Sequence, residues 1–325
     1  MILAKAVMGA LPNYYFSMYL APKKVIQMLD AIRRDFVWGR KDGKNKIRWI
    51  AWKKMVRPKR YGGFGIGDLR SMNLALLVKW GWKYKTDSEA LWAKVVKAIH
   101  ESKRSKKHIP VDNRNRGIWK DVIAAYKELE SAGISLKEKM VVKLGNGAKT
   151  MFWLDNWNGD MPFVKKYPDL FKIVKNKDAK VADVVIRLEA ENQWNIDWSR
   201  PPNGDGEWAQ WSGMLNDLNK ATSNNGEDRW GWMTNKWEDF SVAIIKDQLM
   251  KPLIGEQEEQ WKHWNTWAPA KVNYFTWRTA MGRILVKSEL RKRGIMLDKD
   301  TCSRCGVADE SVKHLVSDCT SLKSV

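Results

Sequence analysis

Cysteine is scarce in this chain: its 325 residues include three, and all of them lie between positions 302 and 319. An odd number of clustered cysteines argues against the disulfide framework of a small secreted protein. We therefore expect an intracellular protein, in the nucleus or the cytoplasm. Long apolar runs are missing as well. The apolar opening is interrupted at Pro12 and Asn13 and has no basic segment before it. It therefore predicts a buried helix rather than a membrane span or a signal peptide.

Acidic residues are also under-represented, with 37 Asp and Glu against 58 Lys and Arg, a net charge of +21. The surplus is uneven. Residues 23–60 carry fourteen basic and three acidic side chains, 187–259 carry seven and fourteen, and 262–300 carry nine and three. Two basic stretches around an acidic middle favour a polyanionic partner, and nucleic acid is the first candidate. A merely basic soluble protein, or one that binds an acidic protein, remains the alternative.

A phosphate-cradling loop is not evident. The segment "YGGFGIGDL", residues 61–69, is rich in glycine, but no Gly-Lys-Ser or Gly-Lys-Thr follows it. The dinucleotide motif would also need a preceding strand. We interpret the segment as a turn or a close approach of two backbones.

Helical periodicity dominates the first hundred residues. Apolar spacing predicts helices over 22–38, 68–84 and 88–100, and a short helix begins near Ile118. The run 102–117 is polar and basic and reads as a linker. Around Asn146–Gly147, residues 139–157 predict a hairpin. Residues 162–255 are acidic, rich in tryptophan and weakly patterned.

These patterns predict a mainly α chain of the α+β class, with a small hairpin-containing middle and a small C-terminal zinc-binding module. The expected divisions are a helical basic region (1–101), the linker (102–117), a mixed α/β region (118–255) and a helical zinc-binding region (256–325).

The strongest local motif is C-x2-C-x8-H-x4-C, formed by Cys302, Cys305, His314 and Cys319. A Cys-x2-Cys turn aims two thiolates at one ion, and four such ligands complete a tetrahedral structural zinc site. An open catalytic zinc would keep a water position and need a general base nearby. The alternative is a pair of free buried cysteines with a third nearby by chance. We favour structural Zn²⁺ because all three cysteines and one histidine lie inside a stretch of eighteen residues.

Several segments resemble one protein family. Residues 11–39, 46–84 ("KIRWIAWKKMVRPKRYGGFGIGDLRSMNLALLVKWGWKY") and 91–99 resemble the thumb-like region after the catalytic domain of plant LINE-type (non-LTR) retrotransposon reverse transcriptases. Residues 141–157 resemble a hairpin further along those polyproteins, and 264–319 resemble their zinc-binding region. The resemblance covers nearly the whole chain and is weakest over 162–255.

The resemblance implies RNA-templated DNA synthesis, yet this sequence contains no two adjacent aspartates to hold the catalytic metals of a polymerase. The family's nuclease and palm have no counterpart here, and Met1 falls within what resembles a thumb helix. We therefore expect a 5′-truncated element or excised fragment without polymerase or endonuclease activity. Only the four zinc ligands carry over from the family by residue.

The function expected from the sequence is non-catalytic binding of RNA or DNA phosphates. The candidate contacts are basic side chains of the two basic stretches: Lys23, Lys24, Arg33, Arg34, Lys53, Lys54, Arg57, Lys59, Arg60, Arg278, Arg283, Arg291, Lys292, Arg293 and Arg304. Among the 20 tryptophans, Trp264, Trp267 and Trp277 are the better candidates for stacking on unpaired bases, whereas Trp49, Trp52, Trp80 and Trp82 fit a core. The alternatives are a protein-interaction scaffold and an element relic without function.

Overall fold

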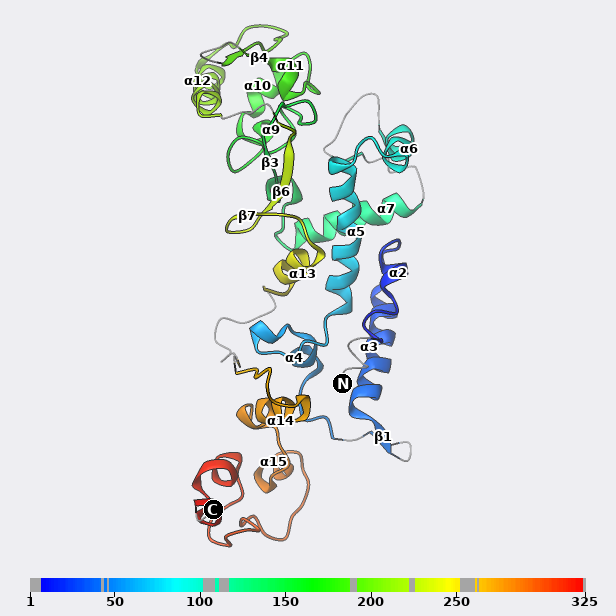
Figure 1. Ribbon diagram of the computed structural model, residues 1–325, viewed down its shortest axis with the longest axis vertical. Helices are drawn as coiled ribbons and strands as arrows, with labels where there is room; N and C mark the ends of the chain where they lie inside the picture. Colours follow the sequence, from blue (N-terminus) through cyan, green and yellow to red (C-terminus); the bar gives the residue numbers. More distant parts are fainter. Residues whose placement is uncertain are drawn as a thin grey trace. The chain divides into compact units, whose positions relative to one another are not determined.

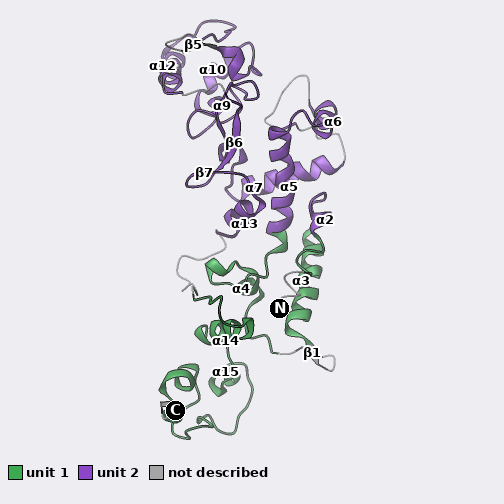
Figure 2. Ribbon diagram, viewed as in Figure 1, with its two compact units in different colours: residues 1–12, 22–70, 252–325 green, residues 13–21, 71–251 purple. Residues whose placement is uncertain are grey.

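A computed structural model describes residues 7–41, 44–45, 47–101, 109–110, 117–187, 192–221, 226–251, 261 and 263–323 (Figure 1). The chain forms two compact units: unit 1 comprises residues 1–12, 22–70 and 252–325, and unit 2 comprises 13–21 and 71–251 (Figure 2). Within the described residues, no helix is both long and apolar enough to cross a membrane.

Unit 1 is built from short elements of both ends of the chain. They are α3 (Lys23–Trp38), the strand pair β1 (Arg40–Lys41) and β2 (Lys44–Asn45), α4 (Trp52–Val56), the 3-10 turn η1 (Lys59–Tyr61), α14 (Ala270–Ala280), α15 (Lys287–Arg291), the π-helical turn η3 (His314–Asp318) and α16 (Thr320–Lys323).

The helix expected over 22–38 is confirmed as α3, which ends at Gly39 with a φ of 71°. Arg33 on this helix differs from its expected role at a surface. Its side chain is 2% exposed, pairs with Asp30 at 2.9 Å and donates to the carbonyl of Gly67 at 2.8 Å. A guanidinium committed to these partners fastens α3 to the glycine-rich segment and is not available to a phosphate at the surface.

The glycine-rich segment folds back on α4, as the sequence suggested. Its N–H groups at Phe64 and Ile66 donate to the carbonyls of Lys54 and Met55 at 3.2 and 3.1 Å. A Cβ added at Gly63 would lie 2.3 Å from the carbonyl oxygen of Arg57. Only glycine fits there, because the two backbones touch.

The core of unit 1 joins the two ends of the chain. Trp277 of α14 is fully buried beside Ile50, Met55 and Ile66, and its indole N–H donates to the carbonyl of Gly62 at 2.9 Å. The expectation that Trp277 stacks on bases is therefore wrong: it is a core residue.

Unit 2 contains most of the helices and both larger strand groups. Its elements are α2 (Asn13–Phe16), α5 (Leu69–Thr86, whose first two residues belong to unit 1), α6 (Leu91–His100), α7 (Ile118–Ser131), α8 (Leu136–Lys139), β3 (Met140–Lys143), α9 (Phe163–Lys166), α10 (Pro168–Ile173), α11 (Val181–Val184), β4 (Val185–Arg187), β5 (Asn192–Trp194), α12 (Asp205–Asn219), β6 (Arg229–Met233), β7 (Trp237–Glu238) and α13 (Val242–Met250). The helices expected over 68–84, 88–100 and from Ile118 are confirmed as α5, α6 and α7.

The units divide the chain at other places than the composition of the sequence suggested. Leu77 and Val78 of α5 are fully buried in the core of unit 2, together with Val122 and Ala125 of α7. The hydroxyl of Tyr126 donates to the carbonyl of Val78 at 3.2 Å. Because this apolar face of α5 packs on α7, the first hundred residues do not form one region. The expected linker lies largely outside the described residues.

The middle is mixed, as expected, but its hairpin lies elsewhere. β3 pairs antiparallel with β6, and β6 pairs with β7, giving a three-stranded sheet in a mostly helical structure. The turn at Asn146–Gly147 is a loop instead of a hairpin. Asp228 explains it, because its carboxylate accepts from the N–H groups of Gly145 at 2.8 Å, Gly147 at 2.9 Å and Lys149 at 3.1 Å.

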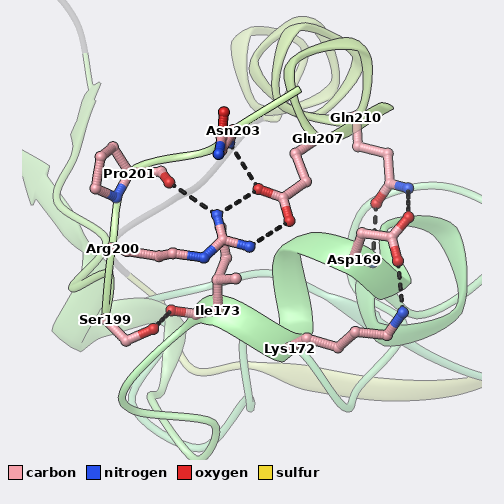
Figure 3. A network of polar contacts seen from close by, with 9 residues as sticks. All are labelled: Asp169, Lys172, Ile173, Ser199, Arg200, Pro201, Asn203, Glu207 and Gln210. Carbon is pink, nitrogen blue, oxygen red and sulfur yellow. Dashed lines mark hydrogen bonds and ion pairs between the residues drawn. The ribbon is translucent and has the colours of Figure 1, made fainter. Parts of the chain in front are cut away.

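A polar network links α10 to α12 (Figure 3). Arg200 forms a bidentate pair with Glu207 at 2.8 and 2.7 Å, and the N–H of Asn203 donates to the same carboxylate at 2.7 Å. The Arg200 hydrogen bond is the main cause that lowers the pKa of Glu207 to about 2. Gln210 and Asp169 exchange two further hydrogen bonds at 3.1 and 2.6 Å. These polar side chains around α10 and α12 therefore have a structural role, since they hold the two helices together.

The expectation of a buried opening helix is wrong for the described part. Helix α2 covers four residues, and the side chains of Leu11, Tyr14 and Tyr15 are exposed. Residues 1–6 lie outside the described part of the chain.

Replacing Asp228 tests how the loop is held. Burial raises the pKa of its carboxyl, but the N–H groups of Gly147, Gly145 and Lys149 outweigh burial and leave the pKa below its ordinary value. We expect Asp228→Asn to lower the unfolding free energy of unit 2 by about 1–3 kcal/mol, because the amide cannot accept from all these donors.

A carboxyl with a lowered pKa stabilises the fold above its unfolded pKa of about 3.9 and loses that contribution as the pH falls through the folded pKa. The difference in unfolding free energy between wild type and Asp228→Asn, measured by urea unfolding, should therefore be largest at neutral pH and should decrease in acid. The exposed Asp160→Asn serves as control. A difference in unfolding free energy that increases in acid would contradict this account.

Candidate metal centre and basic pocket

Two of the four metal ligands come from a tight turn at residues 301–309. Thr301 and Asp309 form a β-bridge, and the N–H of Cys302 donates to the carbonyl of Ala308 at 2.7 Å. The N–H of Gly306 donates to the carbonyl of Cys302 at 2.9 Å. This turn brings Cys302 and Cys305 to one side, as the Cys-x2-Cys spacing predicted.

The other two ligands come from η3. The hydroxyl of Ser311 accepts from the N–H of His314 at 3.1 Å and caps the start of this segment. The N–H of Cys319 donates to the carbonyl of His314 at 2.8 Å, an i to i+5 bond. A π-helical turn therefore matches the four-residue spacer between His314 and Cys319.

The four ligand atoms converge. The sulfurs of Cys302, Cys305 and Cys319 and a ring nitrogen of His314 all lie within 4.8 Å of one another, and Cys305 Sγ is 3.2 Å from His314 Nε2. Zinc–ligand bonds of about 2.0–2.3 Å at tetrahedral angles place ligand atoms roughly 3.5–3.8 Å apart. The donor set fits, and all four positions are protein side chains. This is a structural Zn²⁺ site.

Backbone N–H groups favour thiolates at two of the ligands. Those of Cys305 and Arg304 lower the pKa of Cys302, and those of Val307 and Ala308 lower the pKa of Cys305. Burial raises the pKa of Cys319. Two of the thiols are thus prepared as anionic ligands by the turn itself, and metal binding deprotonates the third.

Glu310 connects α15 to the turn at residues 301–309 (the metal turn). Its backbone carbonyl accepts from the N–H of Ser288 at 3.1 Å, and its carboxylate accepts from the N–H groups of Lys287 and Ser303, both at 3.3 Å. The ammonium of Lys287 donates to the carbonyl of Thr301 at 2.7 Å. The position of α15 is therefore tied to the zinc ligands.

Glu289 of α15 then gathers three basic side chains. It is buried, and its carboxylate contacts Lys292 at 2.7 Å, Arg293 at 3.0 Å and Arg283 at 3.4 Å. The Lys292 hydrogen bond is the main cause that lowers the pKa of Glu289. A carboxylate buried among cations stays ionised and holds them in place.

Arg283 and Arg293 line a pocket of about 700 Å³ in unit 1. Five cations surround it: Arg34, Arg48, Lys54, Arg283 and Arg293. None of the described residues that line it is acidic. The volume lies in the range of roughly 300–1,000 Å³ that is typical of ligand pockets.

Three tryptophans, Trp38, Trp49 and Trp52, form the aromatic part of the lining. The guanidinium of Arg293 lies over Trp49 at 4.5 Å, and that of Arg48 lies over Trp38 at 5.4 Å. Such cation–π contacts orient the arginines without neutralising their charge.

The structure separates the predicted basic residues into three groups. Those that line the pocket are Arg34, Lys54, Arg283 and Arg293. Outside its lining and at least partly exposed are Lys23, Lys24, Lys53, Arg57, Lys59, Arg60, Arg278, Arg291, Lys292 and Arg304. Arg33 is buried. Among the stacking candidates, Trp267 is 95% exposed, whereas Trp264 packs against the core of unit 1.

Sequence reasoning missed Arg48, Trp38 and Glu289 as parts of this arrangement, and it assigned Trp49 and Trp52 to the core alone. One signal was present for Arg48, which lies in the strongly basic stretch. Nothing local marked Glu289, because its partners are set by packing.

One comparison with known protein families agrees with the metal centre. The family described as zinc-binding in reverse transcriptase matches residues 243–325. A protein described as a putative ribonuclease H protein of Arabidopsis thaliana is 24% identical over 98% of this chain, which spans 50% of that relative's length. An uncharacterized mitochondrial protein of Arabidopsis thaliana is 30% identical over 46% of this chain and 92% of its own length. No solved structure matches.

Removing one ligand tests the metal centre. Zinc should co-purify at about one ion per chain, and Cys305→Ser should lose it, because three ligands bind far more weakly than four. Hydrogen exchange should rise over residues 301–323, where the metal organises the chain. Ser317→Ala, at an exposed position of η3 between the ligands His314 and Cys319, should retain zinc. Full zinc content in Cys305→Ser would refute the ligand assignment.

Proposed function

Because this chain carries the zinc-binding region of reverse transcriptases and belongs to the same family as its uncharacterized mitochondrial relative, we propose that it is a non-catalytic nucleic-acid-binding protein. Its likeness to plant LINE-type retrotransposon reverse transcriptases points to the part that follows their catalytic domain. RNA, DNA or a hybrid of the two would be held through phosphates.

One observation carries the proposal: cations that are far apart in sequence meet at one pocket. Arg34 and Lys54 come from the first basic stretch, and Arg283 and Arg293 come from the second. Arg34 has no ion-pair partner among the described residues. Glu289 offsets part of the charge of Arg283 and Arg293, whereas no ion pair within the described part of the chain offsets that of Arg34. The positive charge gathered at the pocket attracts phosphates and releases counterions on binding.

The zinc site has a supporting role in this function. The metal turn holds Glu310, Glu310 holds α15, and Glu289 of α15 holds Arg283 and Arg293. Phosphate contacts of this kind give affinity that depends on salt and carry little sequence information.

The absence of catalysis is part of the proposal and rests on the sequence, which has no adjacent aspartates. In a primer-extension assay with RNA template, DNA primer and Mg²⁺ or Mn²⁺, we expect no extended product. Any product that depends on the metal and on this chain would overturn the non-catalytic assignment.

A second candidate, a protein-interaction scaffold, is favoured by one observation. Helix α3 exposes an apolar stripe at Val25, Met28, Ile32 and Phe36. Salt separates the two functions, because an apolar interface is little affected by moderate salt, whereas phosphate binding weakens steeply.

Loss of charge at the pocket should flatten the salt dependence of nucleic-acid binding. For Arg34→Ala/Arg48→Ala we expect weaker binding and a log–log salt slope smaller by about 0.7–0.9 per lost phosphate contact, measured by fluorescence anisotropy.

The matched control is Lys127→Ala/Lys137→Ala, which removes the same charge from exposed positions of unit 2. Equal effects of the two double variants would show that net charge alone matters, and an unchanged slope in both would place the phosphate contacts elsewhere.

A further inference from the structure

We infer that the pocket of unit 1 takes an unpaired nucleotide of a single strand, with its base stacked at the Trp49–Arg293 side and its phosphate at the Arg34 side. This inference rests on the proposed function and adds the kind of nucleic acid that the pocket selects. It follows from the chemistry of the two sides, which differ.

The Trp49 side combines an indole with two guanidinium groups, because Arg278 also lies over Trp49, at 5.5 Å. Arg293 lies 4.5 Å from the centroid of Trp49, and two contacts with Glu289 hold it there: Nη1 donates to the carbonyl at 2.7 Å and to the carboxylate at 3.0 Å. Bases stack on indoles and on guanidinium planes alike. An arginine already paired with a carboxylate is a weaker phosphate ligand, so its remaining role is to stack.

The Arg34 side offers positive charge that is only weakly compensated. Arg34 lacks an ion-pair partner among the described residues, and the carboxylate of Asp35 is 4.0 Å from Arg48, at the limit of an ion pair. A phosphate placed here would meet two guanidinium groups that are largely uncompensated. The contacts would be charge-assisted hydrogen bonds, which are stronger than those between neutral groups.

A duplex cannot use both sides at once. Its bases are paired and stacked on each other, so only its backbone reaches a protein pocket, whereas an unpaired base can turn into it. The pocket of about 700 Å³ has three tryptophans in its lining, which also pack against the core of unit 1 and which phosphate contacts alone would not use. The aromatic lining therefore points to single-stranded RNA or DNA.

The test separates bases from phosphates on the ligand. Fluorescein-labelled single strands of 12 nucleotides, as RNA and as DNA, are compared by anisotropy with a DNA strand of the same length whose sugars lack bases, and with a blunt duplex. We expect the abasic strand to bind the wild-type protein roughly 5- to 150-fold more weakly than the normal strand, which is the loss of at least one stacked base.

On the protein side, Arg293→Lys keeps the charge and removes the planar guanidinium. It should reduce the preference for the base-bearing strand and leave the salt slope unchanged. Arg229→Lys is the matched control, because Arg229 lies over Trp237 at 5.6 Å in unit 2, outside the pocket. Zinc content and thermal unfolding of both variants report whether the fold is intact, and the abasic comparison on wild type needs no variant.

The outcomes distinguish the inference from the proposed function. Equal binding of normal and abasic strands with a steep salt slope would overturn the stacked base and leave phosphate binding standing. Duplex binding as tight as single-strand binding would overturn it as well. Binding that is absent, or indifferent to salt, would refute both. Competition by a nucleoside monophosphate as strong as by the oligonucleotide would overturn the assignment to a strand.

Discussion

Coordination of one ion by Cys302, Cys305, His314 and Cys319 is the constraint on which the C-terminal part of unit 1 depends. From Leu290 to Leu322, the buried residues are Cys302 and Cys319, both of them ligands. A segment that buries none of its apolar side chains fully has no core of its own, so the closed metal site supplies the free energy that a core would otherwise provide. The thiolate-favouring N–H groups of the turn assist it.

Hydrogen bonds and ion pairs connect the metal site to the basic pocket. Glu310 connects the metal turn to α15, and Glu289 of α15 connects it to Arg283 and Arg293. The indole of Trp277, donating to the carbonyl of Gly62, joins α14 to the glycine-rich segment. Basic side chains from both stretches therefore line one pocket.

Local patterns predicted the parts of the structure that local physics controls. Helices α3, α6 and α7 follow apolar spacing, and the close approach at Gly63 follows the run of glycines. The hairpin at Asn146–Gly147 failed because Asp228, some eighty residues away, provides better acceptors for that loop than a second strand would. Arg33 and Trp277 were misassigned for the same reason, since partners distant in sequence decide whether a polar or aromatic side chain is buried.

The amino-acid sequence by itself determined the zinc ligands, the helical character and the basic charge, because each depends on residue type and on spacing over a few turns of chain. Tertiary structure alone decided that Arg33 is buried with Asp30, that Glu289 pairs with Arg283 and Arg293, and which cations line a pocket with Trp38, Trp49 and Trp52. The physical reason is that desolvation and pairing depend on neighbours in space. Those neighbours come from both ends of a chain of 325 residues.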